Sequence, residues 1–207
     1  MKPVRDENPN APWEMIVKLS YVKNIDLCSE AQYRAEDIKA YYIWGLSCAE
    51  VETDILTGNV QVTRVDILED TGESMSPGID VGQIEGAFVM GIGYYLTEAL
   101  VYDNESGALL TNRTWTYKPP GAKDIPIDFR VNFLHSSANP AGVLRSKATG
   151  EPALNMTIVV LFALRYALRS ARKDAGLPDN WIPMGTPTTP DQVYLLAGNT
   201  TEQYMLN

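Results

Sequence analysis

The stretch VETDILTGNVQVTRVDIL, residues 51–68, decides the fold class of this chain. In its first half, apolar or β-branched residues alternate with acidic ones, the period of a half-buried strand: Val51, Thr53 and Ile55. The next residues, 57–59, are Thr-Gly-Asn, in which glycine and asparagine tolerate the positive φ of a tight turn. Residues 41–70 are therefore predicted to contain a β-hairpin.

The return strand of this hairpin carries a change in its alternation. Its apolar residues occupy even positions at Val60 and Val62, and odd positions at Val65 and Ile67. One extra residue in a strand produces such a change, because side chains alternate between faces with a period of two. We therefore predict a β-bulge near residues 63–64.

Two long apolar segments follow the hairpin and are predicted to be buried helices. The first runs from about Val81 to Leu100, and the second from Pro152 to about Ala175, before the stop signals Gly176 and Pro178. The second is apolar almost all round in its first half, as in a helix at a domain centre.

Shorter elements are expected around these helices. The sequence predicts a helix after Pro12, a second hairpin that turns at 104–107, a strand over 127–133 and a last short helix starting at Thr189. The order of elements predicts an α+β (mixed α/β) fold, with hairpins packed around two buried helices, and not a regular βαβ series.

Composition excludes several classes of function. The 207 residues include 17 Lys and Arg against 26 Asp and Glu, a net charge of −9, so neither nucleic acid nor an anionic membrane is an expected partner. Two cysteines and one histidine are too few for a disulfide scaffold, an iron–sulfur cluster or a multi-histidine metal site. No apolar run reaches the roughly 18 residues needed to span a bilayer, and the first residues lack the apolar core of a secretory signal, so we expect a soluble, cytoplasmic protein.

The sharpest chemical feature is SKATGEP, residues 146–152, which puts Glu151 at the mouth of the second apolar helix. In one interpretation Glu151 only stabilises the positive end of that helix. In the other it is a general base, because a carboxylate at the edge of an apolar helix is partly desolvated, and desolvation raises its pKa toward working pH. The sequence by itself leaves both open.

Gln83 has two similar interpretations. Asp80 followed by Gln83 has the form of a capping box at a helix start. Alternatively, Gln83 hydrogen-bonds a polar cofactor where glycines let the backbone be approached closely. Three glycines lie on roughly one face of this helix: Gly82, Gly86 and Gly93. Each costs about 1 kcal/mol of helix stability relative to alanine, which favours a close approach at this face.

Four stretches together resemble the molybdenum hydroxylase family, the xanthine dehydrogenases and aldehyde oxidases. They occur in the family's order and spacing: WGLSCAEVETDILTG (44–58), SPGIDVGQIEGAFVMGIGYY (76–95), TYKPPGAKDIPIDFRV (116–131) and RSKATGEPAL (145–154). The resemblance covers nearly the whole chain, from about Lys2 to Gln192. Two stretches, TWTYKPPGAKDIPIDFRV (114–131) and NPAGVLRSKATGEP (139–152), more closely resemble the aldehyde oxidases, especially those of arthropods, than the xanthine dehydrogenases.

The resemblance implies a role for three residues. The family's general-base glutamate corresponds to Glu151, and its cofactor-binding glutamine to Gln83. The residue two positions before the glutamate also lines the pterin in relatives. Here it is Thr149, where many members have an aliphatic residue. No protein ligand to the metal is implied, since the dithiolene of the pterin holds the molybdenum.

The same resemblance implies a function and its limits. Residues 1–207 are expected to be the C-terminal portion of a molybdopterin-binding domain, in which Glu151 activates a molybdenum-bound hydroxyl for the oxidation of an aldehyde or N-heterocycle. Two 2Fe–2S clusters and FAD are implied only in the N-terminal domains of a full-length homodimer. We therefore expect the isolated chain to be an inactive fragment.

Two other functions remain open from the sequence. The chain is alternatively a non-catalytic remnant or interaction module that pairs with full-length relatives. A third alternative is an unrelated small-molecule binding protein in which Glu151 is only a capping residue.

Overall fold

The computed structural model describes all residues except 33–39, 136, 141–142 and 200–207, and it divides the chain into two units, Met1–Ile38 and Lys39–Asn207. The first unit holds helices α1 (Lys2–Glu7) and α2 (Trp13–Val22). Helix α2 confirms the helix predicted after Pro12, which occupies the N-cap position. In the described part of this first unit, Val4 of α1 and Ile16 of α2 are the buried apolar residues.

The second unit is built on a three-stranded sheet in the order β1-β2-β3. Strands β1 (Gly45–Thr53) and β2 (Val60–Glu69) are antiparallel and form the predicted hairpin. Strand β3 (Asp128–Phe133) pairs with β2 in parallel, so the sheet is mixed. The predicted bulge is also confirmed, because Glu50 pairs with Arg64 and Val51 with Val62, which leaves Thr63 as the extra residue of β2.

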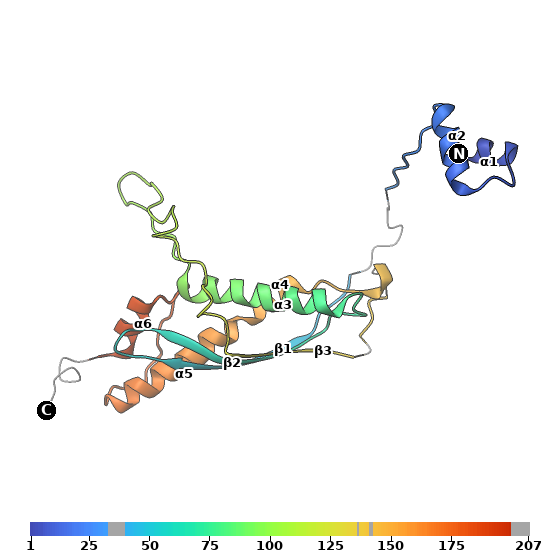
Figure 1. The fold of residues 1–207 in the computed structure, drawn as a ribbon. Coiled ribbons are helices and arrows are strands. Elements are labelled where there is room, and N and C mark those ends of the chain that lie inside the picture. Colours follow the sequence, from blue (N-terminus) through green and yellow to red (C-terminus); the bar gives the residue numbers. More distant parts are fainter. Residues whose placement is uncertain (33–39, 136, 141–142, 200–207) are drawn as a thin grey trace. The chain divides into compact units, whose positions relative to one another are not determined.

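Helices cover one face of this sheet (Figure 1). Helix α3 (Pro77–Ile92) continues into a π-helical turn, η1 (Gly93–Thr97), and contacts β3. Helix α4 (Gly150–Met156) leads into α5 (Ile158–Asp174), which packs along β1. The 3-10 turn η2 (Val143–Arg145) precedes α4, and α6 (Pro190–Ala197) starts at the predicted position after Thr189.

One hydrophobic core joins these helices to the inner face of the sheet. Phe88 of α3 packs edge-to-face on Phe129 of β3, with ring centroids 5.4 Å apart. The strand alternation sends Val62, Val65 and Ile67 inward, where they are buried. The remaining buried members come mainly from α3 and α5: Ile84, Ile92, Val160, Leu164 and Leu168. The α+β arrangement around two core helices is thus as predicted.

The second hairpin is much smaller than expected. Residues 104–107 do form a turn, in which Asp103 accepts hydrogen bonds from Ser106. The two described segments that flank this turn are paired by a single antiparallel bridge, between Tyr102 and Leu109. The segment is largely exposed and has no sheet to join, and an isolated two-stranded hairpin is marginally stable in water.

The long C-terminal apolar helix is divided in two at Thr157. The buried Thr157 hydroxyl lies 3.1 Å from the carbonyl oxygen of Ala153 and 3.2 Å from that of Phe88, which ties the break to α3. By length and composition, Gly150–Asp174 would reach across a membrane, contrary to the expectation from its sequence. However, the buried residues of α5 pack in the hydrophobic core, and core helices of soluble proteins can have the same length and apolar composition.

Candidate active site

Two packed helices, α3 and α4, bring the predicted site residues into one region. Helix α4 packs against α3, and a Cβ at Gly150 would lie 4.0 Å from the Cβ of Ala87. Ala87 lies four positions, about one turn, after Gln83 on α3. Glu151 is in the first turn of α4, and Thr149 immediately precedes that helix. The structure therefore places Gln83 and Glu151 on adjoining helices, although they are far apart in the sequence.

Glu151 is solvent-exposed at the start of α4. In the described part of the chain its carboxylate has no hydrogen-bond or ion-pair partner, so it is free to act on a ligand. Its charge also suits the positive end of the helix, so the simpler structural role remains compatible with this position. The partial desolvation expected from the sequence is not supplied by the described residues, because they leave the Glu151 side chain exposed.

The capping-box interpretation of Gln83 is wrong. Helix α3 begins at Pro77, after Ser76, so Gln83 lies well inside the helix and cannot reach back to its start. Asp80 instead accepts a hydrogen bond of 2.5 Å from the Ser74 hydroxyl. Gln83 is exposed, and its amide makes no hydrogen bond with the described residues. No hydrogen bond within the described ranges therefore gives Gln83 a structural role.

The glycines of α3 divide into two groups. A Cβ added to Gly82 or Gly86, on either side of Gln83, would meet nothing within 4 Å. A Cβ on Gly91 would lie 2.3 Å from Oγ1 of Thr157, and one on Gly93 would lie 2.3 Å from Oε1 of Glu98. The close approach predicted for this helix is thus made within the chain at Gly91 and Gly93, whereas the backbone beside Gln83 stays open.

Thr149 is half-buried at the N-cap position of α4, with φ of −124°. Its side chain makes no capping hydrogen bond to the helix. The position of the α4 N-terminus therefore depends on the residues before it.

A buried acidic cluster lies at the end of β2, and the sequence analysis missed it. Glu69 is 0% exposed, and neither of its carboxylate oxygens has a hydrogen-bond partner among the residues that the structure describes. Burial raises the pKa of Glu69 to about 8, and the charges of Asp70 and Asp80 add to this effect. Strand parity could have located this residue, because Glu69 is two positions after the buried Ile67 and faces the same way.

Asp70, the next residue, behaves differently. Burial raises its pKa, but hydrogen bonds from Lys147, Ser137 and the Gly72 amide outweigh burial, so its pKa is lowered overall. Nζ of Lys147 lies 2.5 Å from Oδ2 of Asp70, and the two side chains are 8% and 1% exposed. The two adjacent carboxyl groups of this cluster therefore favour opposite protonation states near neutral pH.

We expect Glu69→Met to stabilise the fold more at alkaline than at acidic pH. The folded-state pKa of Glu69, about 8, lies above its ordinary value of 4.5, so the wild-type chain loses stability as the pH rises between these two values. The variant has no such loss and should gain ~1–3 kcal/mol more at about pH 9 than at about pH 5. Thermal unfolding at both pH values measures this, with the exposed Glu52→Met as control. An equal gain at both pH values would contradict a neutral, buried Glu69.

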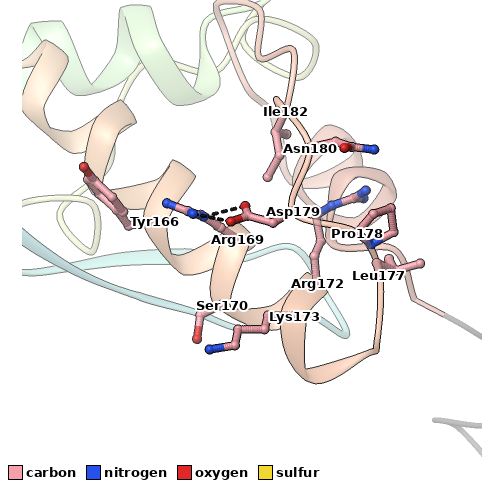
Figure 2. Close-up of a pocket in the computed structure, with 10 residues that line it drawn as sticks. All are labelled: Tyr166, Arg169, Ser170, Arg172, Lys173, Leu177, Pro178, Asp179, Asn180 and Ile182. Atoms are coloured by element: carbon pink, nitrogen blue, oxygen red, sulfur yellow. Dashed lines mark hydrogen bonds and ion pairs between the residues drawn. The ribbon is translucent and has the colours of Figure 1, made fainter.

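The hollow drawn in Figure 2 lies away from these residues, beside the C-terminal half of α5. It measures about 390 Å³, and an ion pair between Arg169 and Asp179 crosses it, with Nε 2.6 Å from Oδ1. Its lining includes neither Gln83, Thr149 nor Glu151. The hollow is open, and its central charges are already paired. The region where α3 packs against α4 is therefore the better candidate for an active site.

Known proteins share this fold and sequence. The molybdopterin cofactor-binding domain family matches residues 2–126. Xanthine dehydrogenase of Dictyostelium discoideum is 36% identical over 93% of this chain, and mouse aldehyde oxidase 4 is 35% identical over 99% of it. The crystal structure of quinoline 2-oxidoreductase from Pseudomonas putida 86 superimposes with a TM-score of 0.55 and 29% identity, covering 72% of this chain and 18% of that one.

These similarities establish the family. The chain belongs to the molybdenum hydroxylases, the oxidoreductase family of xanthine dehydrogenase and aldehyde oxidase, and carries a molybdopterin cofactor-binding domain. It spans only 15% of the Dictyostelium relative and 16% of the mouse one. Relatives of both names match almost equally well, so identity alone does not separate the two branches. Family membership does remove the alternative of an unrelated small-molecule binding protein.

Proposed function

We propose that this chain is part of the catalytic molybdopterin-binding domain of an aldehyde oxidase-type enzyme, with Glu151 as its general base. The proposed substrates are aldehydes or N-heterocycles, which are converted to acids or hydroxylated products. The observation that carries the proposal is the packing of α4 on α3, which puts the Glu151 carboxylate and the Gln83 amide on neighbouring helices, each without a partner among the described residues. The aldehyde oxidase branch is supported by the resemblance of residues 114–131 and 139–152 to aldehyde oxidases.

The residues on α3 fit a polar cofactor. Gly82 and Gly86 leave the backbone beside Gln83 open, and an added Cβ at either would occupy that space. The Gln83 amide offers both a donor and an acceptor to such a group. Molybdopterin, when bound, supplies the redox chemistry of the reaction. In this proposal Gln83 hydrogen-bonds the cofactor, and Thr149 contacts it from the start of α4.

Glu151 has the chemistry of a proton acceptor. Its carboxylate has no partner among the described residues, so both oxygens are available to take a proton from the attacking nucleophile. Closure of the site by the rest of a full-length enzyme would exclude water there, which favours general-base action. Gln83 and Thr149 orient the reacting groups, whereas Glu151 moves the proton.

The proposal extends to the complete enzyme. We infer that iron–sulfur clusters and FAD in other domains accept the electrons, that the enzyme is a cytoplasmic homodimer, and that the 207-residue chain alone is inactive. The alternative, a non-catalytic module that pairs with full-length relatives, predicts that no protein containing this sequence oxidises these substrates.

The direct test is to assay a full-length protein containing this sequence with benzaldehyde, a simple N-heterocycle and xanthine. We expect molybdenum-dependent oxidation of the aldehyde or heterocycle, with xanthine turned over more slowly. Preferred oxidation of xanthine would reject the aldehyde oxidase branch. A molybdenum-loaded protein that oxidises none of the three would reject the catalytic proposal.

Replacement of Gln83 tests the cofactor contact. Gln83→Ala should lower the molybdenum and pterin content of the purified full-length enzyme about 10-fold or more, because loss of a buried hydrogen bond to a ligand costs about 1.4 kcal/mol or more. Metal analysis and pterin fluorescence measure the loss. Gln192→Ala, at an exposed position of α6, is the control. Full cofactor content in Gln83→Ala would contradict the assignment.

A further inference from the structure

The segment that carries Glu151 is held to the end of β2 by a buried ion pair. Nζ of Lys147 lies 2.5 Å from Oδ2 of Asp70 and 3.0 Å from the carbonyl oxygen of Tyr42. Lys147 is four positions before Glu151, and its side chain is buried. A lysine that is 8% exposed requires such partners, because a buried charge without them is strongly unfavourable.

Backbone hydrogen bonds run alongside this ion pair. The amide of Lys147 donates to the carbonyl of Thr71 at 3.0 Å, and the amide of Glu73 donates to the carbonyl of Arg145 at 2.9 Å. Gly72 and Ser146 form an antiparallel bridge between the two segments. Residues 145–147 are therefore paired with 71–73, the loop that leads into α3 and Gln83.

The turn before this pairing has an unfavourable backbone. Leu144 and Arg145 have φ of 49° and 65°, the left-handed region that favours glycine. Such a conformation persists only where surrounding contacts hold it. At the other end of the segment, Thr149 makes no side-chain cap to α4. Local sequence preferences therefore do not set the start of α4, and the contacts of residues 145–147 do.

We propose that Lys147 and Asp70 are a positioning pair that sets the location of Glu151. The pair joins the loop before α3 to the segment before α4, so it also fixes the spacing between α3, which carries Gln83, and the start of α4, which carries Glu151. This inference rests on the proposed function of Glu151. Neither Lys147 nor Asp70 touches the substrate in it.

The test separates positioning from stability with two variants of the full-length enzyme. Lys147→Met alone leaves Asp70 buried without its cation, so it should destabilise the fold as well as misplace Glu151. Lys147→Met combined with Asp70→Asn removes both charges, while an Asn oxygen still accepts the Gly72 amide. We expect the double variant to recover the melting temperature of the wild type. Its kcat per bound molybdenum should stay at least about 10-fold below the wild-type value, since small displacements of a catalytic group have large effects.

Hydrogen exchange gives a second readout that does not depend on the cofactor. In both variants, amides in residues 145–152 should exchange about 10-fold faster or more, whereas those of α5 in the double variant should be unchanged. The matched control is Arg64→Met with Asp66→Asn, which removes an ion pair from the outer face of the same strand. That control should alter neither kcat nor exchange in residues 145–152.

Three outcomes would overturn the positioning role. These are a double variant with wild-type kcat per molybdenum, unchanged exchange in residues 145–152 of both variants, or a loss of kcat in the Arg64→Met, Asp66→Asn control that equals the loss in the double variant. Comparison with Glu151→Gln identifies which proposal has failed. If Glu151→Gln is inactive while the double variant is fully active, only the positioning inference fails. If Glu151→Gln retains activity, the general-base proposal itself fails.

Discussion

Glu151→Gln in the full-length enzyme is expected to lower kcat for an aldehyde by at least about 100-fold. The substitution keeps the size of the side chain and its place in the first turn of α4, but it removes the proton-accepting oxygen. Because Glu151 is exposed and has no partner in the described chain, its loss leaves no buried group unsatisfied. The fold and the cofactor content should therefore be unchanged. Steady-state kinetics per bound molybdenum measure the effect.

The control for this prediction is Glu105→Gln, which changes an exposed glutamate in the 104–107 turn. Its kcat should equal that of the wild-type enzyme. If the Glu151 variant kept turnover within a few-fold of wild type while fully loaded with molybdenum, Glu151 would be only a favourable charge at a helix end. That result would leave the family membership intact and reject the catalytic role.

Gly91→Ala is expected to destabilise the fold by about 2 kcal/mol. The new Cβ would lie 2.3 Å from Oγ1 and 2.6 Å from Cβ of Thr157, and 3.0 Å from the Leu154 carbonyl oxygen. Thr157 cannot move away without losing its contacts to the carbonyls of Phe88 and Ala153. Overpacking of about 3 kcal/mol therefore outweighs the gain of about 1 kcal/mol that alanine brings to a helix.

The matched variant is Gly86→Ala in the same helix. Since its Cβ would meet nothing within 4 Å, only the gain in helix propensity applies, and the fold should be stabilised by up to about 1 kcal/mol. Thermal unfolding of the two variants should differ in sign, with Gly91→Ala lowered by about 4–8 °C. If both variants shifted the same way, the packing of α3 on the α4–α5 junction would be described incorrectly.

Several elements were predictable because the relevant signal is local. The alternation over residues 51–68 locates the hairpin and its bulge, since each side chain's face depends only on its neighbours along the strand. The start of α6 follows in the same way from Thr189 and Pro190. Local signals were less reliable at the start of α3, where Ser76-Pro77 begins the helix earlier than Asp80 and Gln83 indicate. Two overlapping start signals compete there, and the earlier one prevails.

The candidate site was only partly accessible from the sequence. The resemblance to a known family identified Gln83, Thr149 and Glu151. By contrast, the pair formed by Asp70 and Lys147 joins segments widely separated in sequence, and no periodicity or motif connects them. The close approach to the glycines of α3 was expected, but at Gly82 and Gly86 as well as Gly93. Within this chain it occurs at Gly91, where the break at Thr157 meets α3, and at Gly93, where Glu98 and Pro120 come close.

The amino-acid sequence by itself determined the α+β class, the hairpin with its bulge, the core helices and the family of this chain. The first three follow from the periodicity of apolar residues and from turn residues, which depend on a few neighbouring positions. The family follows from the order of motifs along the chain. Only the tertiary structure decided which helix face is covered, that Glu69 is buried without a hydrogen-bond partner in the described part of the chain, and that Lys147 reaches Asp70. Burial and ion pairing depend on segments brought together by packing, and their free energies are set by the surroundings and not by the residue types alone.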